Sequence, residues 1–204
     1  MPAAVIPLLC LASASPRRRE LLAQIGVAHV VAGADIDESV QPGEHPADYV
    51  LRMARSKALA VRERSAGLPV LAADTTVVID DSICGKPHDE AEGVAMLERL
   101  SGRTHQVLTA VALAAADTVA VRLSASAVRF RPLARAECVA YWRSGEPRDK
   151  AGGYAVQGYA AVFIERLTGS YSGVMGLPLY ETAQLLAAAG LSVAPPAAGR
   201  DHSP

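Results

Sequence analysis

Two long β-rich runs, separated by only three residues, constrain the fold of this chain more than any other feature. HQVLTAVALAA covers residues 105–115, VAVRLSASAVRFRPL covers residues 119–133, and residues 116–118 form a turn between them. This arrangement predicts an antiparallel hairpin. Helical patterns precede and follow the hairpin. The sequence therefore predicts an α/β fold, a mixed β-sheet with helices on both faces.

The remaining segments alternate between strand and helix patterns. We expect strands at 5–12, 27–33, 68–80 and 160–167, and helices at 16–25, 46–64, 89–100, 134–143 and 177–190. Residues 145–158 show no apolar periodicity and are expected to form a functional or exposed loop. The length suits one domain, residues 1–192, and the Pro/Ala-rich composition of residues 193–204 predicts a disordered tail.

Charge and composition exclude some classes of partner. The formal net charge of -1 argues against a broad nucleic-acid surface, although one local basic pocket remains compatible with it. No apolar run approaches the length of a membrane span, and the apolar N-terminal stretch is interpreted as a strand and not as a signal peptide. Three widely spaced cysteines, with neither disulfide nor zinc spacing, favour reduced thiols in a cytoplasmic protein.

The stretch LASASPRRREL contradicts the usual charge preference of a helix start. Ser15 is a typical N-cap and Pro16 a typical first helical residue, yet residues 17–19 are all arginine. A helix N-terminus is already partly positive. Free backbone N–H groups, the hydroxyls of Ser13 and Ser15 and the guanidinium groups would suit a bound phosphate. Three solvated arginines pointing outward are the alternative.

Two charged residues occur where apolar ones are expected. Lys57 falls on the apolar stripe of the second predicted helix, so its side chain either snorkels to water or points into a polar cleft. Asp74 falls within the apolar run LAADTTVVI, so it needs a metal, a cation or several donors, unless it marks a bulge or a strand end.

Lysine is scarce in this chain, because Lys57, Lys86 and Lys150 are the only lysines among 20 basic residues. They are either kept where a compact ammonium is needed or present by chance. With the arginines, Asp74 and the loop acid Glu38, they form a set suited to phosphoryl chemistry. The P-loop, GxGxxG, GxSxG and HExxH patterns are all absent. His105 is either a general base or a hydrogen-bonding structural residue.

Six blocks of the chain resemble the Maf family in order and spacing, over roughly residues 8–190. They are LASASPRRRELL, the DES loop, AADTTVV followed by GKP, LSGRTHQVLTAVAL, EPRDKAGGYAVQG and GSYSGVMGLPLYET. Maf proteins are nucleoside triphosphate pyrophosphatases, sometimes described as septum-formation inhibitors. The resemblance implies a fold of the inosine-triphosphate-pyrophosphatase type, with two lobes around a cleft, and often a homodimer.

The resemblance also implies cleavage between the α- and β-phosphates with Mg²⁺ or a similar cation such as Mn²⁺ or Co²⁺. Asp74 matches the family's catalytic acid residue, the proton acceptor for the attacking water, and with Glu38 it would hold the metal. The phosphate- and metal-handling positions of the family are matched by Ser13, Arg18, Glu38, Lys57 and Lys86. Of these, Lys57, Lys86 and Arg18 would stabilise the leaving pyrophosphate.

Three further residues concern the substrate. Arg17, Thr75 and Gln157 match the positions that mark the dTTP/UTP branch, whereas the 7-methyl-GTP branch has an aromatic residue at the position of Arg17. The amide of Gln157 can both donate and accept along a pyrimidine edge. We expect hydrolysis of dTTP and UTP, with modified pyrimidine nucleotides as further candidates. The alternatives are a non-catalytic nucleotide-binding regulator of septum formation, a 7-methyl-GTP-type pyrophosphatase and a general phosphatase.

Overall fold

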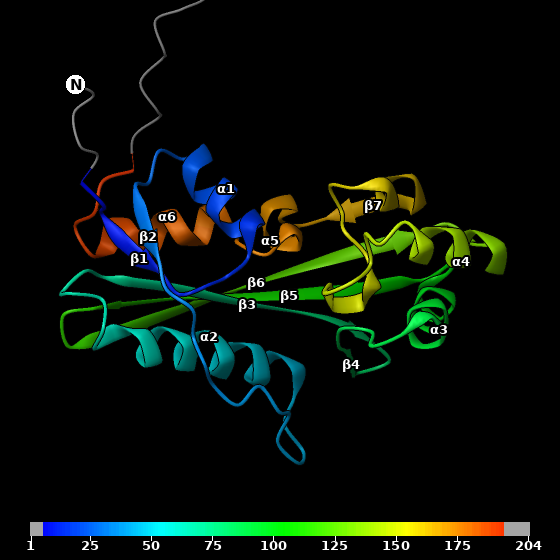
Figure 1. Cartoon of the computed structure of the whole chain (residues 1–204), viewed down its shortest axis with the longest axis horizontal. Helices are drawn as coiled ribbons and strands as arrows, with labels where there is room; N and C mark the ends of the chain where they lie inside the picture. Colours follow the sequence, from blue (N-terminus) through cyan, green and yellow to red (C-terminus); the bar gives the residue numbers. More distant parts are fainter. Residues whose placement is uncertain (1–5, 194–204) are drawn as a thin grey trace, which may run out of the picture.

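The computed structural model describes residues 6–193, which form one seven-stranded sheet with helices around it (Figure 1). The strands are β1 (Leu9–Leu11), β2 (His29–Val31), β3 (Val70–Ile79), β4 (Ser82–Cys84), β5 (Thr104–Ala115), β6 (Thr118–Phe130) and β7 (Ile164–Thr168). The helices are α1 (Pro16–Gln24), α2 (Pro46–Arg62), α3 (Glu90–Leu100), α4 (Arg135–Arg143), α5 (Tyr171–Met175) and α6 (Leu179–Ala188), with 3₁₀ turns η1 (Ala151–Gly153) and η2 (Tyr159–Phe163).

The sheet is mixed, as predicted, with the strand order β2-β1-β3-β5-β6-β7 and β4 paired to β3. β1 runs parallel to β2 and to β3, and α1 and α2 supply the crossovers that parallel neighbours need. β3, β5, β6 and β7 pair antiparallel. The predicted hairpin is present, because β5 and β6 pair from Thr104↔Arg129 to Ala115↔Thr118.

The long strands β3, β5 and β6 run through the whole molecule and carry a group of helices at each end (Figure 1). At one end, α2 packs on one face through Val50 and Ala54, while α1 and α6 cover the other through Leu22 and Leu186. At the opposite end, α3, α4 and η2 surround Phe130. Each end has its own core, so the molecule has two lobes. Of the helices between residues 6 and 193, none combines the length and apolarity needed to cross a bilayer.

The predicted strand at residues 160–167 is wrong in its first half. Residues 159–163 form η2, and only Ile164–Thr168 pairs with β6. Ala160 and Phe163 are both buried and three residues apart, which places them on one side of a 3₁₀ turn. The short elements β4 and α5 were not expected, because three and five residues are too few to show a period. The predicted tail lies outside the described residues, except for Val193.

His105 belongs to the core of the second lobe. Its side chain is 2 % exposed, and its Nε2 lies 2.8 Å from the hydroxyl of Tyr154. The imidazole also packs edge-on against Phe130, with the ring centroids 5.1 Å apart. Burial lowers the pKa of His105 to about 4, so the ring is neutral at pH 7. These surroundings favour the structural interpretation of His105 over a general base.

We predict that His105 makes the fold lose stability as the pH falls from about 6.5 to about 4. The unfolded chain protonates this imidazole at about 6.5, whereas the folded protein does so only near 4. The free energy of unfolding therefore falls over this window, by up to about 3 kcal/mol. The glutamine in His105→Gln does not titrate, so the free energy of unfolding of this variant should fall less over the same pH window. Urea denaturation of both proteins across this window checks the prediction, and parallel declines would contradict it.

Candidate active site

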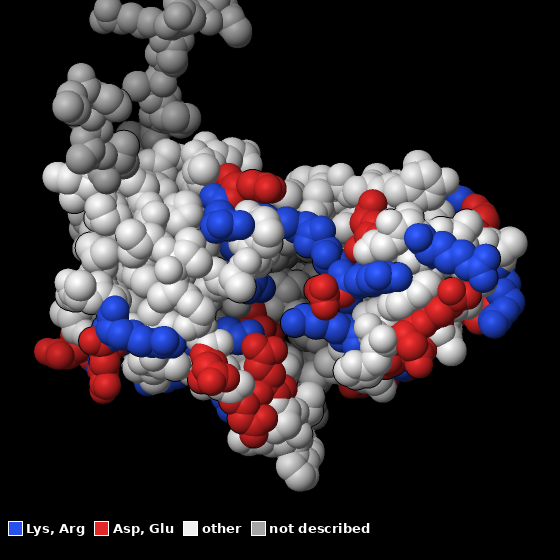
Figure 2. Space-filling view, viewed as in Figure 1, with Lys and Arg blue, Asp and Glu red and all other residues white. Residues whose placement is uncertain are grey.

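The cleft lies where one edge of β3 has no neighbouring strand among residues 6–193. β1 pairs with β3 only at Val70 and Leu71, and β4 pairs with it only from Val77 to Ile79. Residues 72–76 between them pair with β5 on the other edge alone. A cavity of about 460 Å³ opens at this gap, between the two lobes (Figure 2). Consecutive side chains of β3 point to opposite sides of the sheet. Because this edge of β3 is unpaired here, Asp74 on one side and Thr75 on the other both line the cavity.

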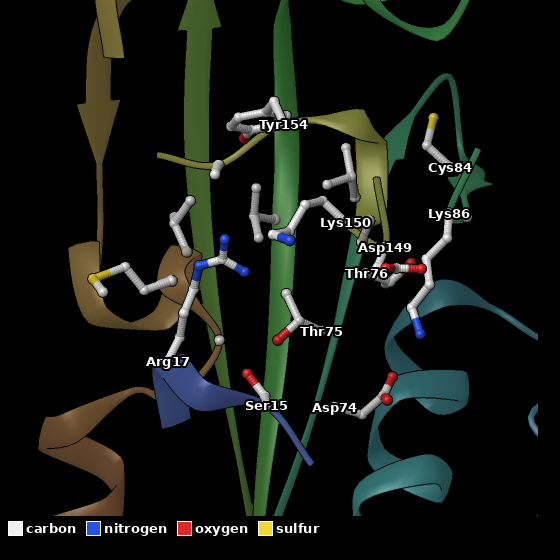
Figure 3. A pocket seen from close by; sticks show the side chains of 18 of the residues that line it. Ser15, Arg17, Asp74, Thr75, Thr76, Cys84, Lys86, Asp149, Lys150 and Tyr154 are labelled. Atoms are coloured by element: carbon white, nitrogen blue, oxygen red, sulfur yellow. The ribbon is translucent and has the colours of Figure 1, made fainter. Parts of the chain in front are cut away.

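The structure brings the predicted site residues together. The cavity is lined by Ser15, Arg17, Arg18, Glu38, Lys57, Asp74, Thr75, Lys86 and Gln157. Figure 3 labels Ser15, Arg17, Asp74, Thr75 and Lys86 among them. The remaining predicted residue, Ser13, contacts Arg18 directly. The segment 145–158, which was expected to form a functional or exposed loop, contributes part of the wall.

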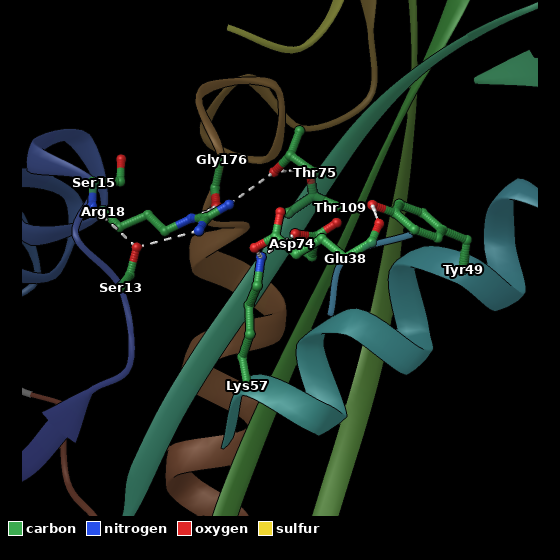
Figure 4. Close-up of polar contacts among 10 residues, drawn as sticks. All are labelled: Ser13, Ser15, Arg18, Glu38, Tyr49, Lys57, Asp74, Thr75, Thr109 and Gly176. Atoms are coloured by element: carbon green, nitrogen blue, oxygen red, sulfur yellow. Dashed lines mark hydrogen bonds and ion pairs between the residues drawn. The ribbon is translucent and has the colours of Figure 1, made fainter. Parts of the chain in front are cut away.

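Lys57 and Asp74, which both line the cavity, form a buried ion pair (Figure 4). Lys57 Nζ lies 2.7 Å from Asp74 Oδ1 and 2.7 Å from Glu38 Oε1. Lys57 and Asp74 are only 8 % and 7 % exposed. Lys57 therefore points into the polar cleft and does not snorkel. Asp74 pairs in register with Ala110 inside the strand, so it marks neither a bulge nor a strand end, and its cation is Lys57.

Glu38 is held beside this pair from the loop before α2. Burial alone would raise the pKa of Glu38, but the hydrogen bond and charge of Lys57 outweigh it, with help from Lys86 and Arg18, and the net pKa is lowered. The Tyr49 hydroxyl donates to the Glu38 carbonyl oxygen at 3.0 Å and so ties the loop to α2. Burial, with the charges of Asp74 and Glu38, raises the pKa of Tyr49 to about 12, so Tyr49 is a neutral donor.

The three consecutive arginines have different surroundings, because successive helical residues point in directions about 100° apart. The Arg17 guanidinium points into the cavity (Figure 3). Arg18 belongs to α1, and its side chain reaches the Gly176 carbonyl oxygen directly after α5. Arg19 is exposed and is not part of the cavity lining. Only Arg19 therefore fits the interpretation of outward, solvated arginines.

Arg18 is an anchored side chain that joins three segments (Figure 4). Its guanidinium donates from Nε to the Gly176 carbonyl oxygen (2.7 Å), from Nη1 to Ser13 Oγ (3.2 Å) and from Nη2 to Thr75 Oγ1 (3.4 Å). Ser13 Oγ also accepts from the backbone N–H of Ser15 (3.2 Å). Ser15 stands at the N-cap position before Pro16, as predicted, but within the described chain its side chain makes no capping bond.

Thr75 continues this hydrogen-bonded chain toward α5. The hydroxyl oxygens of Thr75 and Thr109 lie 3.0 Å apart, and Thr109 Oγ1 lies 2.8 Å from the Gly173 carbonyl oxygen. A hydroxyl has one proton to donate. Because the Thr109 hydroxyl donates its proton to the Gly173 carbonyl oxygen, it accepts a hydrogen bond from the Thr75 hydroxyl. The Thr75 hydroxyl in turn accepts from Arg18. Arg18 and α5 are thereby coupled through Thr75, one of the residues expected to mark the substrate branch.

The opposite wall of the cavity carries Lys86 and Gln157. Lys86 follows β4, and the neighbouring Gly85 carbonyl accepts the backbone N–H of Gly152 at 3.0 Å. Gly152 has φ +71°, and a Cβ there would lie 2.7 Å from a methyl carbon of Val77. Only glycine allows the segment before Gln157 to pack so closely on β3. Gln157 itself is exposed at the cavity wall.

Comparison with known proteins identifies the family. The family described as Maf-like protein matches residues 8–189. The chain belongs to the Maf family. It is 55 % identical over 182 residues to a dTTP/UTP pyrophosphatase of Saccharophagus degradans, with 87 % of each chain covered. It is also 55 % identical over 185 residues to one of Methylobacillus flagellatus (90 % of this chain, 93 % of the relative) and 53 % identical over 188 residues to one of Hahella chejuensis (91 % and 94 %). The resemblance and the α/β fold expected from the sequence are therefore confirmed.

The acidic residues of this Maf protein fit a divalent cation only if a phosphate shares it. Within residues 6–193, no group of three or more His, Cys, Asp or Glu residues is placed to hold a metal alone. Asp74 and Glu38 nevertheless converge on one ammonium, so their oxygens lie close together. Mg²⁺ is typically held by one or two carboxylates together with substrate phosphates. The donor set fits such a cation.

Sequence reasoning missed several lining residues of the Maf cleft. Val107, Tyr154, Val156, Val174 and Met175 form an apolar part of the wall, which suits a flat nucleobase. Their alternating or isolated apolar character is typical of ordinary core residues, so no signal distinguished them. Lys150 also lines the cavity. The sequence feature that could have predicted this is the scarcity of lysine, because the other two lysines, Lys57 and Lys86, line the same cavity.

We predict that the losses of stability caused by removing Lys57 and by removing Asp74 are not additive, because each removal leaves the other charge buried without its partner. Lys57→Met leaves an uncompensated buried carboxylate and should lower the free energy of unfolding by about 3 kcal/mol. The double variant Lys57→Met/Asp74→Asn should be more stable than the sum of the two single losses predicts. Glu38→Gln should cost less than about 1 kcal/mol, because Glu38 is half exposed. Urea denaturation at neutral pH of these three variants and of Asp74→Asn alone measures the losses, and additive losses in the double variant would contradict the prediction.

Proposed function

We propose that this chain hydrolyses dTTP and UTP to the nucleoside monophosphate and pyrophosphate. The observation that carries the proposal is the pair of carboxylates bridged by Lys57 in a cleft lined by Arg17, Arg18 and Lys86. Cations of this kind suit a polyphosphate, and a carboxylate among them suits water activation. The names of the relatives, dTTP/UTP pyrophosphatase, support the same activity.

Asp74 acts as the base in this proposal. One carboxylate oxygen is held by Lys57, while the other has no hydrogen-bond or ion-pair partner within residues 6–193. This second oxygen takes a proton from water as the water oxygen bonds to the α-phosphorus and the bond to the bridging oxygen of the β-phosphate breaks. Lys57, Lys86 and Arg18 stabilise the negative charge that develops on the departing pyrophosphate.

We also propose that Glu38 and Asp74 hold a divalent cation, Mg²⁺ in the first instance and Mn²⁺ or Co²⁺ as alternatives. Bound with the substrate, the cation supplies Lewis-acid polarisation of the phosphate oxygens. By analogy with the family, the proposal includes a homodimer. It also includes a cytoplasmic location, supported by three cysteines that are free and buried.

Substrate choice is assigned to Arg17, Thr75 and Gln157, with modified pyrimidine nucleotides as further candidate substrates. Arg17 from α1, Gln157 from the segment 145–158 and Thr75 from β3 all line the cavity. Arg17 offers a guanidinium fork, and Gln157 offers a donor and an acceptor for a base edge.

The first test is a product assay on the purified protein with Mg²⁺ and dTTP, UTP, CTP, GTP or 7-methyl-GTP. We expect pyrophosphate from dTTP and UTP, no turnover with chelator present, and at least about a 100-fold lower kcat for Asp74→Asn, because general-base catalysis contributes that much. Orthophosphate as the product would favour the general phosphatase. Binding without turnover under any of the three metals would favour the regulator.

The second test concerns Arg17. Arg17→Trp should lower kcat/KM for dTTP and UTP by about tenfold or more, because a charge-assisted contact is lost. Arg19→Trp is the matched control: it makes the same change one residue further along α1, outside the cavity, and should leave kcat/KM unchanged. Equal effects of both substitutions, or undiminished pyrimidine turnover in Arg17→Trp, would contradict the assignment.

A further inference from the structure

Lys150 lines the cavity but has no part in the reaction described above. Its ammonium donates to the Arg148 carbonyl oxygen at 3.1 Å, and within residues 6–193 it forms no ion pair with a carboxylate. By contrast, Lys57 forms ion pairs with both Asp74 and Glu38. The Lys150 ammonium therefore enters the cleft with donors to spare.

Lys150 faces a like charge across the cavity. The ammonium of Lys150 and the guanidinium of Arg17 point toward one another from opposite lobes (Figure 3). Burial lowers the pKa of Lys150, and the positive charges of Arg17 and Lys86 lower it as well, against the opposing effect of Asp149 and Glu146. Two cations that face each other across a polar cavity repel unless an anion lies between them.

The backbone fixes Lys150 in this unfavourable position. The backbone N–H of Gly153 donates to the Lys150 carbonyl oxygen at 3.0 Å, and that of Gly152 donates to the Gly85 carbonyl oxygen at 3.0 Å. The contact of Gly152 with Val77 pins the same turn to β3. Asp149, the residue before Lys150, has φ +60°, a conformation that costs energy for a residue with a side chain. The backbone that carries Lys150 is thus held at the cavity wall and is not a free loop.

We propose that Lys150 is a further substrate-binding residue, whose ammonium binds an anionic oxygen of the triphosphate from the lobe opposite Arg17. The inference rests on the proposed function and adds to it a contact with the substrate from the second lobe. The occupant is anionic because an ammonium gains a charge-assisted bond from a phosphate oxygen and only a neutral-acceptor bond from a base carbonyl.

The nearby carboxylates do not replace this role. Glu146 is engaged elsewhere, because it accepts from the Tyr141 hydroxyl at 2.7 Å and from the backbone N–H of Tyr159 at 2.9 Å. Asp149 is exposed and, among the described residues, forms no ion pair with Lys150.

The test is the affinity of the full chain for dTTP, measured by calorimetry with chelator present so that no turnover occurs, at several salt concentrations. Lys150→Met should weaken binding about tenfold and make the affinity less dependent on salt, because one cation–phosphate contact is lost. Lys150→Arg should restore most of both properties. Arg148→Met removes a charge from the same loop outside this cavity and should change neither.

Each outcome decides the inference. Unchanged affinity in Lys150→Met overturns it, as does weaker binding with an unchanged salt dependence, which would place the contact on the base or sugar. Weaker binding that Lys150→Arg does not restore, with a lowered melting temperature, would mean a structural role and also overturns it. If the wild type neither binds nor hydrolyses dTTP, the proposed function fails together with this inference. If the wild type hydrolyses dTTP, the proposed function stands, and the binding data for the Lys150 variants test this inference alone.

Discussion

The buried ion pair between Lys57 and Asp74 is the constraint on which the arrangement of this molecule depends. Two charges with less than a tenth of their surface exposed are tolerated only if they stay together. The pair therefore fixes how α2 is rotated on the sheet and which face of β3 meets it. A slip of one residue in β3 would move Asp74 to the opposite face and leave both charges unpaired. This one contact thus links the register of the central strand to the chemistry of the cleft.

The gap in the sheet explains how one strand can serve both walls of the cleft. Where β1 and β4 leave one edge of residues 72–76 unpaired, Asp74 reaches Lys57 on the α2 side and Thr75 reaches Arg18 on the α1 side. The hydrogen-bonded chain from Arg18 through Thr75 and Thr109 then extends to α5. A substrate that contacts Thr75 would consequently meet a group whose position is already fixed by the fold.

Site residues can be predicted from the sequence where a charged residue interrupts an apolar pattern, but not where a residue fits the pattern of its helix or strand. Lys57 on an apolar stripe and Asp74 in an apolar strand stood out because burying an unpaired charge is expensive. The mixed sheet and the hairpin followed from strand and helix periods. Thr109 matched an ordinary strand pattern, and the partner of Arg18, Gly176, lies 158 residues away, so neither contact left a local signal. The error at residues 160–167 arose because an apolar run has no unique period when it is short.

The different surroundings of Arg17, Arg18 and Arg19 show which positive charges near the cleft are matched by carboxylates and which are not. Arg19 is solvated, and Arg18 is held by a carbonyl and two hydroxyls beside the Asp74 and Glu38 carboxylates. Lys57 is matched by the same two carboxylates. Arg17, Lys86 and Lys150 line the cavity without an ion-pair partner among the described residues. A triphosphate bound in the cavity would bring the negative charge that these three cations lack and would relieve the repulsion that the Asp74 and Glu38 carboxylates leave at the start of α1.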